Sequence, residues 1–154
     1  MTIQEDATAY NVPVKHAMTV DVEDYFQVSA FAQVINPADW DKWPSRVEAN
    51  TETLLLLFER ANIKATFFVL GWVAERYPAL VSQIANAGHE IASHGYSHQL
   101  IYKQSPAVFK EETLKSKQIL EDIVQQAVVG YRAASYSITQ ESLWALDILG
   151  ELGF

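Results

Sequence analysis

The chain alternates short β-prone runs with longer stretches of helical periodicity, and this alternation constrains the fold more than any other feature. Four β-prone runs recur, at residues 16–22, 65–70, 89–93 and 128–131. A helical pattern follows each run, and each strand–helix unit takes about 30 residues. Strands connected in this way are parallel, with right-handed crossovers. The sequence therefore predicts an α/β fold, either an open doubly wound sheet or part of a (β/α) barrel.

The predicted helices have recognisable ends. Ser45 and Glu48 form a capping-box pattern at the start of the first helix. Pro78 at the first helical position and Gly88 after the last one bracket the second helix. The remaining predicted boundaries are Asn62 at the end of the first helix, Ser105 to Gln125 for the third helix, and Thr139 to Gly150 or Gly153 for the fourth.

Length and composition indicate one globular domain. The chain has 154 residues, of which 49% are hydrophobic and 19% charged, so it can bury a core. We expect residues 1–13 to form a loose N-terminal arm and residues 14–154 to form a partial domain. The net charge of −8 argues against nucleic acid as a partner, because an acidic surface repels phosphates.

Two absences in the sequence limit the chemistry and the location. The chain has no cysteine, which excludes disulfides, thiolate metal sites and cysteine nucleophiles. The polar N-terminus lacks the apolar segment of a signal peptide, and no apolar run approaches the roughly 20 residues of a membrane helix. We therefore expect a cytoplasmic protein without a membrane segment.

Acidic side chains follow the first predicted strand. Asp21, Glu23 and Asp24 lie at its end, where functional groups gather in parallel α/β folds. One such carboxylate can bind a cation while another accepts a proton. The alternative is that these acids cap the next segment or face solvent.

A pair of histidines follows the third predicted strand. His94 and His98 are four residues apart, so their imidazoles can point at one ion. Gly95 disfavours a regular helix and favours a turn of helical spacing. Isolated surface histidines are the alternative interpretation. His89 and Glu90 begin the same strand, so we expect them at its opposite end, in a structural role.

Two further candidates lie on the same predicted rim. Arg132 follows the fourth strand and could orient a carboxylate through a bidentate hydrogen bond, or could simply be exposed. Residues 25–44 form a long loop of the kind that is usually functional. Its aromatic side chains suit the apolar faces of sugar rings, or else pack the loop onto the domain. They are Tyr25, Phe26, Phe31, Trp40 and Trp43.

Four segments in this order resemble the successive motifs of the NodB-homology polysaccharide deacetylases, carbohydrate esterase family 4. They are T-V-D-V-E-D, A-T-F-F-V-L-G, G-H-E-I-A-S-H-G-Y-S-H and G-Y-R-A-A-S-Y, and the likeness covers about residues 14–154. The wording DVEDYF and RAASYSIT is most similar to a branch linked to exopolysaccharide loci with exosortase systems. The resemblance implies a distorted (β/α) barrel, usually of seven strands, of which this chain would be a truncated N-terminal part.

The resemblance also implies roles for individual residues. Asp21 would be the catalytic base, oriented by Arg132, and His94 and His98 would bind a divalent metal ion, with zinc favoured over cobalt or manganese. Either Glu23 or Asp24 would be the carboxylate ligand: strand alternation favours Glu23, whereas a turn or bulge would favour Asp24. The substrate would contact Trp40, Trp43 and Tyr136, the last through its backbone N–H at the oxyanion.

The implied activity is hydrolysis of N-acetyl groups on an amino-sugar polysaccharide, in exopolysaccharide biosynthesis. One alternative is a metal-dependent amidase acting on small amides or imides. Another is an inactive metal-binding remnant, because the general-acid histidine of the family's later motifs has no counterpart before Phe154. A partial barrel would also expose strand edges, so self-association is expected.

Overall fold

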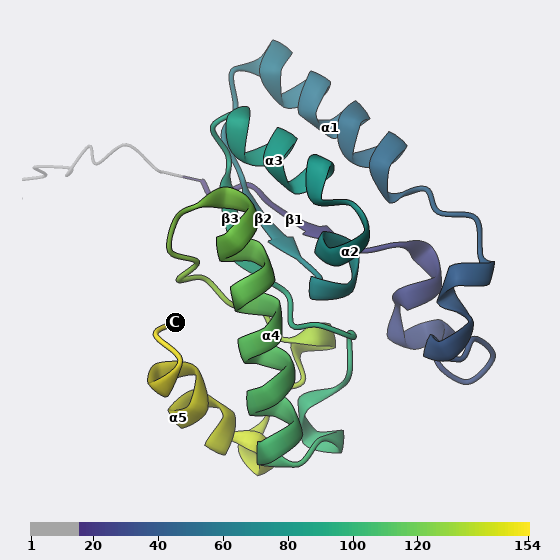
Figure 1. The fold of residues 1–154 in the computed structure, drawn as a ribbon, viewed down its shortest axis with the longest axis vertical. Coiled ribbons are helices and arrows are strands. Elements are labelled where there is room, and N and C mark those ends of the chain that lie inside the picture. Colours follow the sequence, from purple (N-terminus) through teal and green to yellow (C-terminus); the bar gives the residue numbers. More distant parts are fainter. Residues whose placement is uncertain (1–15) are drawn as a thin grey trace, which may run out of the picture.

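A computed structural model describes residues 16–154, so the expected arm at residues 1–13 lies outside the described part. Within that part, a parallel sheet is formed by β1 (Thr19–Val22), β2 (Thr66–Val69) and β3 (Glu90–Ser93). The strand order is β1-β2-β3, and helices connect the strands (Figure 1). The predicted α/β class with parallel strands is therefore confirmed.

Five α-helices accompany the strands between residues 16 and 154. They are α1 (Val47–Ala61), α2 (Gly71–Arg76), α3 (Pro78–Asn86), α4 (Pro106–Val124) and α5 (Trp144–Glu151). The predicted ends of α1 and α4 are confirmed, because Asn62 and Gln125 adopt left-handed conformations with φ of 51° and 54°. The short helix α2 was not predicted. No helix in residues 16–154 has both the length and the apolar character required to cross a bilayer.

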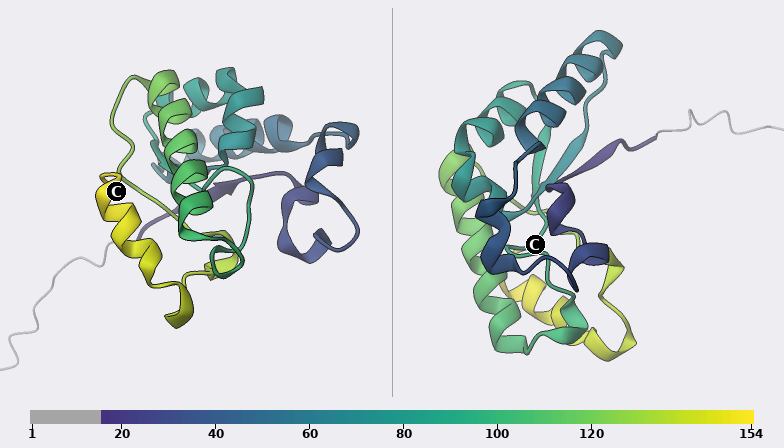
Figure 2. Two further views of the ribbon diagram at one scale, coloured as in Figure 1. Left: turned by 60° about the horizontal axis from the view of Figure 1, so that its bottom comes forward. Right: turned by 90° about the vertical axis from the view of Figure 1, so that its right-hand side faces the viewer.

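The two faces of the sheet differ in what covers them. Phe67, 0% exposed, pairs in register with Ile91 and packs against Phe58 of α1. We call this side, with Val22, Phe67, Val69, Ile91 and Ser93, the helix face; α3 and α4 lie on one side of the sheet in Figures 1 and 2. The alternate residues Thr19, Asp21, Thr66, Phe68 and Ala92 form the open face.

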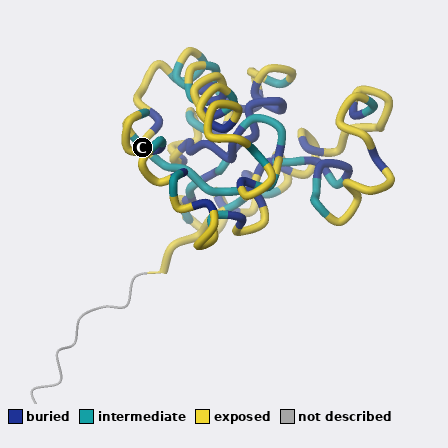
Figure 3. The backbone as a smooth tube through the Cα atoms, turned by 90° about the horizontal axis from the view of Figure 1, so that it is seen from below, coloured by how far each residue is buried: buried dark blue, intermediate teal, exposed yellow. Residues whose placement is uncertain are grey.

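Buried and exposed segments alternate along the backbone in Figure 3. Phe67 and Val69 of the helix face are fully buried, whereas Thr19 and Asp21 of the open face are exposed. Alternating side chains on a strand point to opposite faces, so one four-residue strand serves a core and a solvent-accessible surface.

The fourth predicted strand, residues 128–131, is only partly formed. Tyr131 makes an isolated parallel bridge to Ser93, with one hydrogen bond from Ser93 N to the Gly130 carbonyl (2.8 Å) and one from Arg132 N to the Ser93 carbonyl (2.9 Å). Val129 is 59% exposed, and the described residues place no further strand beside it. A Cβ on Gly130 would lie 2.9 Å from that of Ala92, so this close approach requires glycine.

The predicted capping box of α1 is wrong. Ser45 does not cap the helix; its hydroxyl donates to Asp24 Oδ2 at 2.8 Å. The same carboxylate oxygen accepts from the backbone N–H groups of Arg46 (2.8 Å) and Val47 (3.2 Å). A carboxylate is a stronger acceptor for helix N-terminal N–H groups than a hydroxyl. A distant acid has therefore replaced the local cap, and it ties the end of β1 to α1.

Candidate metal centre

The C-terminal ends of β1 and β3 bring Glu23, His94 and His98 together. One possible ligand atom from each residue lies within 4.8 Å of the others. His98 Nε2 is 3.0 Å from Glu23 Oε2, and the two imidazole ring centres are 5.2 Å apart. Both histidines are buried. The expected convergence of a carboxylate and two histidines is present in the structure.

The orientation of His94 is fixed by the segment that follows residues 128–131. His94 Nδ1 lies 2.8 Å from the carbonyl oxygen of Arg132. Because a carbonyl can only accept, Nδ1 carries the proton and Nε2 presents a lone pair toward Glu23 and Asp21. This is the arrangement that typically orients a histidine ligand.

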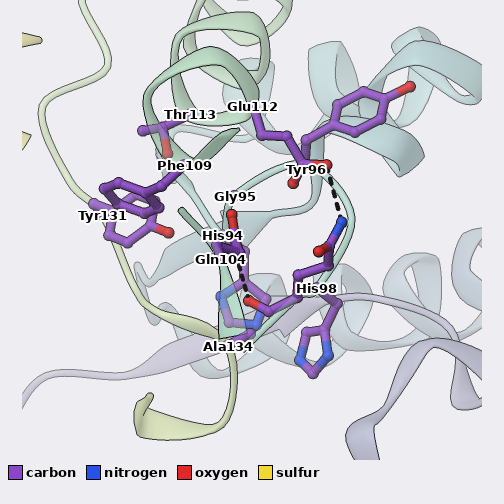
Figure 4. A pocket seen from close by; sticks show the side chains of 11 residues that line it. His94, Gly95, Tyr96, His98, Gln104, Phe109, Glu112, Thr113, Tyr131 and Ala134 are labelled. Carbon is purple, nitrogen blue, oxygen red and sulfur yellow. Dashed lines mark hydrogen bonds between the residues drawn. The ribbon is translucent and has the colours of Figure 1, made fainter. Parts of the chain in front are cut away.

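His98 reaches the centre through an irregular loop rather than a helical turn. Gly95 and His98 both have left-handed backbones, with φ of 76° and 54°. The loop is anchored by hydrogen bonds from Gly71 N to the Gly95 carbonyl (2.8 Å) and from Trp72 N to the Tyr96 carbonyl (3.1 Å). Figure 4 shows both imidazole rings on the side of this loop that is away from Glu112.

The electrostatics of the centre favour a bound cation. Burial and the nearby Asp21 raise the pKa of Glu23 to about 7, whereas burial and the nearby His94 lower the pKa of His98 to about 4. Burial also lowers the pKa of His94. The imidazoles are thus neutral at pH 7. Glu23 Oε2 is buried and has no aligned hydrogen-bond partner among residues 16–154. A divalent ion would satisfy this oxygen and both lone pairs, so these residues fit a metal.

Asp21 lies beside the centre and is held by Arg132. Arg132 Nη1 donates to Asp21 Oδ1 at 2.6 Å, and Nη2 donates to Thr19 Oγ1 at 3.0 Å. The expected bidentate contact with one carboxylate is therefore wrong, because the second arm binds Thr19. The guanidinium lies 3.9 Å above the Phe68 ring. Asp21 Oδ2 remains 3.9 Å from His94 Nε2.

The structure separates the two acids between which the sequence left the ligand open, because Glu23 lies beside the histidines and Asp24 does not. Asp24 is not in the cluster, which corrects its expected role as a ligand. The residue is 3% exposed, and its carboxylate accepts hydrogen bonds from Tyr25 N, Ser45 Oγ, Arg46 N and Val47 N. These four donors hold it away from the two histidines. Glu23 and Asp24 are adjacent in sequence but point to different surroundings.

The expected sugar-contacting aromatics have different environments. Trp40 is 4% exposed, and its ring packs edge-on against Trp72 at 5.4 Å and obliquely against Phe26 at 6.3 Å. Trp40 therefore belongs to the core, but it also lines a groove of about 250 Å³ beside His98, so its expected contact with the substrate stays a prediction. Trp43 is 41% exposed at the end of a 3₁₀ helix, Pro37–Lys42, and does not line the cavity at the centre.

Tyr136 borders a cavity of about 180 Å³ that also contacts Asp21, Glu23, His94 and His98. Its side chain is 91% exposed, so the ring is available at the rim. Its backbone N–H, however, is directed at the Ala133 carbonyl at 3.4 Å. The expected oxyanion donor is thus already engaged, which argues against that part of the prediction.

Two features of the site carry no sequence signal. Ser29 Oγ and Ser135 Oγ lie 2.9 Å apart and link the loop of residues 25–44 to the loop after Arg132. Glu112 of α4 hydrogen-bonds to the loop of residues 94–99, which we call the histidine loop. It lies beside a cavity of about 10 Å³ with room for about one water molecule (Figure 4). Both contacts join distant segments through residue types that are common on surfaces, so no local motif reveals them.

Comparison with known proteins agrees with this geometry. The family model described as polysaccharide deacetylase matches residues 39–153. A peptidoglycan-N-acetylglucosamine deacetylase of Bacillus cereus is 35% identical over 98 residues, which cover 63% of this chain and 36% of that protein. A chitooligosaccharide deacetylase of Bradyrhizobium is 28% identical over 99 residues, covering 64% of this chain and 43% of that protein. This chain thus spans less than half the length of these relatives.

Solved structures of carbohydrate esterases have a similar fold. A family 4 carbohydrate esterase from Streptomyces lividans, solved with acetate, superposes with a TM-score of 0.68 over 90% of this chain and 58% of that chain. At 19% identity this likeness concerns the fold alone, and the three-stranded sheet corresponds to part of that larger architecture. The match of the family model over residues 39–153 shows that the chain belongs to the polysaccharide deacetylase family.

Proposed function

We propose that this chain carries the metal centre of a hydrolase that removes N-acetyl groups from an amino-sugar polysaccharide. The observation that carries the proposal is the convergence of Glu23, His94 and His98 beside Asp21, at the strand ends where parallel α/β folds place their chemistry. Sequence likeness to relatives that bear the names of peptidoglycan and chitooligosaccharide deacetylases supports it.

Glu23, His94 and His98 would hold the ion. Two neutral imidazole nitrogens and one carboxylate suit zinc, and cobalt or manganese could replace it. When bound, such an ion polarises a carbonyl oxygen and lowers the pKa of a water molecule. Three protein ligands leave coordination positions open, which is typical of catalytic rather than structural sites.

Asp21 would act as the general base. Its Oδ1 is occupied by Arg132, while Oδ2 faces the centre, 3.9 Å from His94 Nε2. The guanidinium keeps the carboxylate oriented. Oδ2 can therefore accept a proton from a water molecule that attacks the N-acetyl carbonyl.

The cavities around the centre are compatible with a sugar chain. A groove of about 250 Å³ adjoins the centre and shares His98 and Val28 with the cavity beneath Tyr136. Its walls combine apolar groups such as Phe26 with the amides of Gln27 and Gln99. Mixed walls of this kind suit a sugar ring, which presents C–H faces and hydroxyl groups together.

The resemblance of DVEDYF and RAASYSIT to an exopolysaccharide-linked branch supports a role in exopolysaccharide biosynthesis as part of this proposal. Self-association through exposed strand edges also remains part of it, because β1 has no partner on its outer side within residues 16–154. Size-exclusion chromatography coupled to light scattering tests the second point; a monomer at all concentrations would contradict it.

The activity is tested with zinc-loaded protein and N-acetylglucosamine tetramers, by measuring the release of acetate and of free amines. We expect release that is abolished in His98→Ala and retained in His16→Ala, which removes an exposed histidine outside the centre. Hydrolysis of small cyclic imides without release from the oligomers would favour the amidase alternative. Zinc binding without hydrolysis of either substrate would favour the inactive remnant.

A further inference from the structure

Glu112 of α4 is bonded to both chain neighbours of His98. The Ser97 hydroxyl lies 2.9 and 2.7 Å from the two Glu112 carboxylate oxygens, and Gln99 Nε2 donates to Glu112 Oε1 at 3.2 Å. Gln99 Nε2 also donates to Ser97 Oγ at 3.0 Å. One carboxylate thus accepts hydrogen bonds from the side chains on either side of a candidate metal ligand, and Figure 4 shows it on the side of the histidine loop opposite the imidazole rings.

The segment needs such an anchor because of its backbone. His98 has φ of 54°, a left-handed conformation that costs a residue with a Cβ about 1 kcal/mol. The loop is neither helix nor strand, so no regular ladder holds residues 97–99 in place. Its first half is fixed differently, by the Ser116 hydroxyl, which donates to the Gly95 carbonyl at 2.9 Å. The half that carries His98 is held by Glu112 and by Gln104, whose Nε2 donates to the Gln99 carbonyl at 3.0 Å.

The chemistry of the contact suits a carboxylate. Both side chains that hydrogen-bond to it act as donors: the Ser97 hydroxyl and the Gln99 amide. A glutamine at position 112 would replace one acceptor oxygen with an NH₂ group and would be uncharged, so it would accept more weakly from these two donors. Glu111, the adjacent residue on α4, is exposed, so it carries the same charge without the contact.

We propose that Glu112 is a positioning residue for the metal centre. It holds His98 in its ligating position through hydrogen bonds to Ser97 and Gln99. The inference rests on the proposed metal centre and adds a support that lies outside it. Residues that orient a metal ligand commonly change metal affinity 10- to 100-fold when they are removed.

The test compares zinc affinity, by competition with a chromophoric chelator, in the wild-type chain, Glu112→Gln and Glu111→Gln. The two variants have the same net charge, so long-range electrostatics cancel. We expect zinc to bind roughly 10-fold or more weakly in Glu112→Gln, and unchanged in Glu111→Gln. Cobalt-loaded Glu112→Gln should also show a changed visible absorption spectrum, because a shifted His98 alters the ligand geometry.

Ser97→Ala provides a second route that leaves α4 intact, and its effect should not add to that of Glu112→Gln, because both variants break one contact. Equal zinc affinity and equal cobalt spectra in Glu112→Gln and Glu111→Gln would overturn the inference. Absence of zinc binding in the wild-type chain would instead refute the proposed metal centre itself. Circular dichroism and melting of each metal-free variant separate loss of position from loss of fold.

Discussion

The two faces of the same three-stranded sheet are built for different purposes. On the helix face, Phe67 and Val69 are fully buried beneath helices. On the open face, one residue away along the strands, Asp21 is exposed and Phe68 lies beneath the Arg132 guanidinium. Stability therefore comes from one side of the strands and the candidate chemistry from the other.

This division means that the two properties can be altered separately. The same contrast recurs between two adjacent acids after β1. Asp24 accepts four hydrogen bonds, two of them from N–H groups at the start of α1, whereas Glu23 keeps a buried oxygen that has no aligned partner within residues 16–154. A group whose hydrogen bonds are complete stabilises the fold, and a group left incomplete is available for a ligand.

The largest effect on stability should come from the helix face. Phe67→Ala removes a fully buried ring packed against Phe58 and His89, and we expect a loss of about 3–5 kcal/mol in the free energy of unfolding. Phe68→Ala, the matched change on the open face, should cost less than about 2 kcal/mol because that ring is only partly buried. Urea unfolding of the metal-free proteins measures both. Equal losses would show that the two faces do not differ energetically.

A smaller loss is expected at Asp24. Asp24→Asn replaces one carboxylate oxygen, which accepts from N–H groups at the start of α1, with an NH₂ group that cannot accept. We expect the free energy of unfolding to fall by about 2 kcal/mol. Zinc affinity should stay within a few-fold of wild type, because Asp24 is not in the cluster. Calorimetric titration checks this; strongly weakened zinc binding in a stably folded Asp24→Asn would restore Asp24 as a ligand.

The smallest effect has the opposite sign. The pKa of Glu23 is raised to about 7 in the folded chain, so its stabilising contribution is complete below its ordinary value of 4.5 and is lost as pH rises through 7. The metal-free Glu23→Gln variant should therefore be more stable than wild type by about 1 kcal/mol at pH 8, with little difference near pH 4.5.

Thermal melting across this pH range tests the prediction, and zinc titration of the same variant should show lost binding. A Glu23→Gln variant that is less stable than wild type at pH 8 would mean that the carboxylate is satisfied within the protein, and the contrast with Asp24 would fail.

Much of this arrangement follows from local patterns. The β-prone runs predicted the parallel sheet, and Asn62 and Gln125 were predicted as helix ends. The order of acids, histidines and arginine along the chain predicted the residues around the centre. These features depend on residues close in sequence, or on the rule that parallel strands end at one edge.

Features that depend on contacts between distant segments were not predictable. The sequence offered Ser45 as the local cap of α1, and only the fold brings Asp24 within reach of it. Trp40 matched a sugar-binding aromatic as well as a core one, and its burial depends on Trp72 of a helix that was not predicted. The weak pairing of residues 128–131 likewise depends on what lies beside them rather than on their β-propensity.

The close approach at Gly130 has a consequence for how this site can vary. Because the chain there lies against Ala92, Arg132 reaches two groups at once: its side chain binds Asp21 and its carbonyl binds the His94 ring. Even the single methyl group of an alanine at position 130 would push this segment off the sheet and disturb base and ligand together. Substitutions at residues 130–132 will therefore move both Asp21 and His94, so a change to only one of these two groups must be made at other positions.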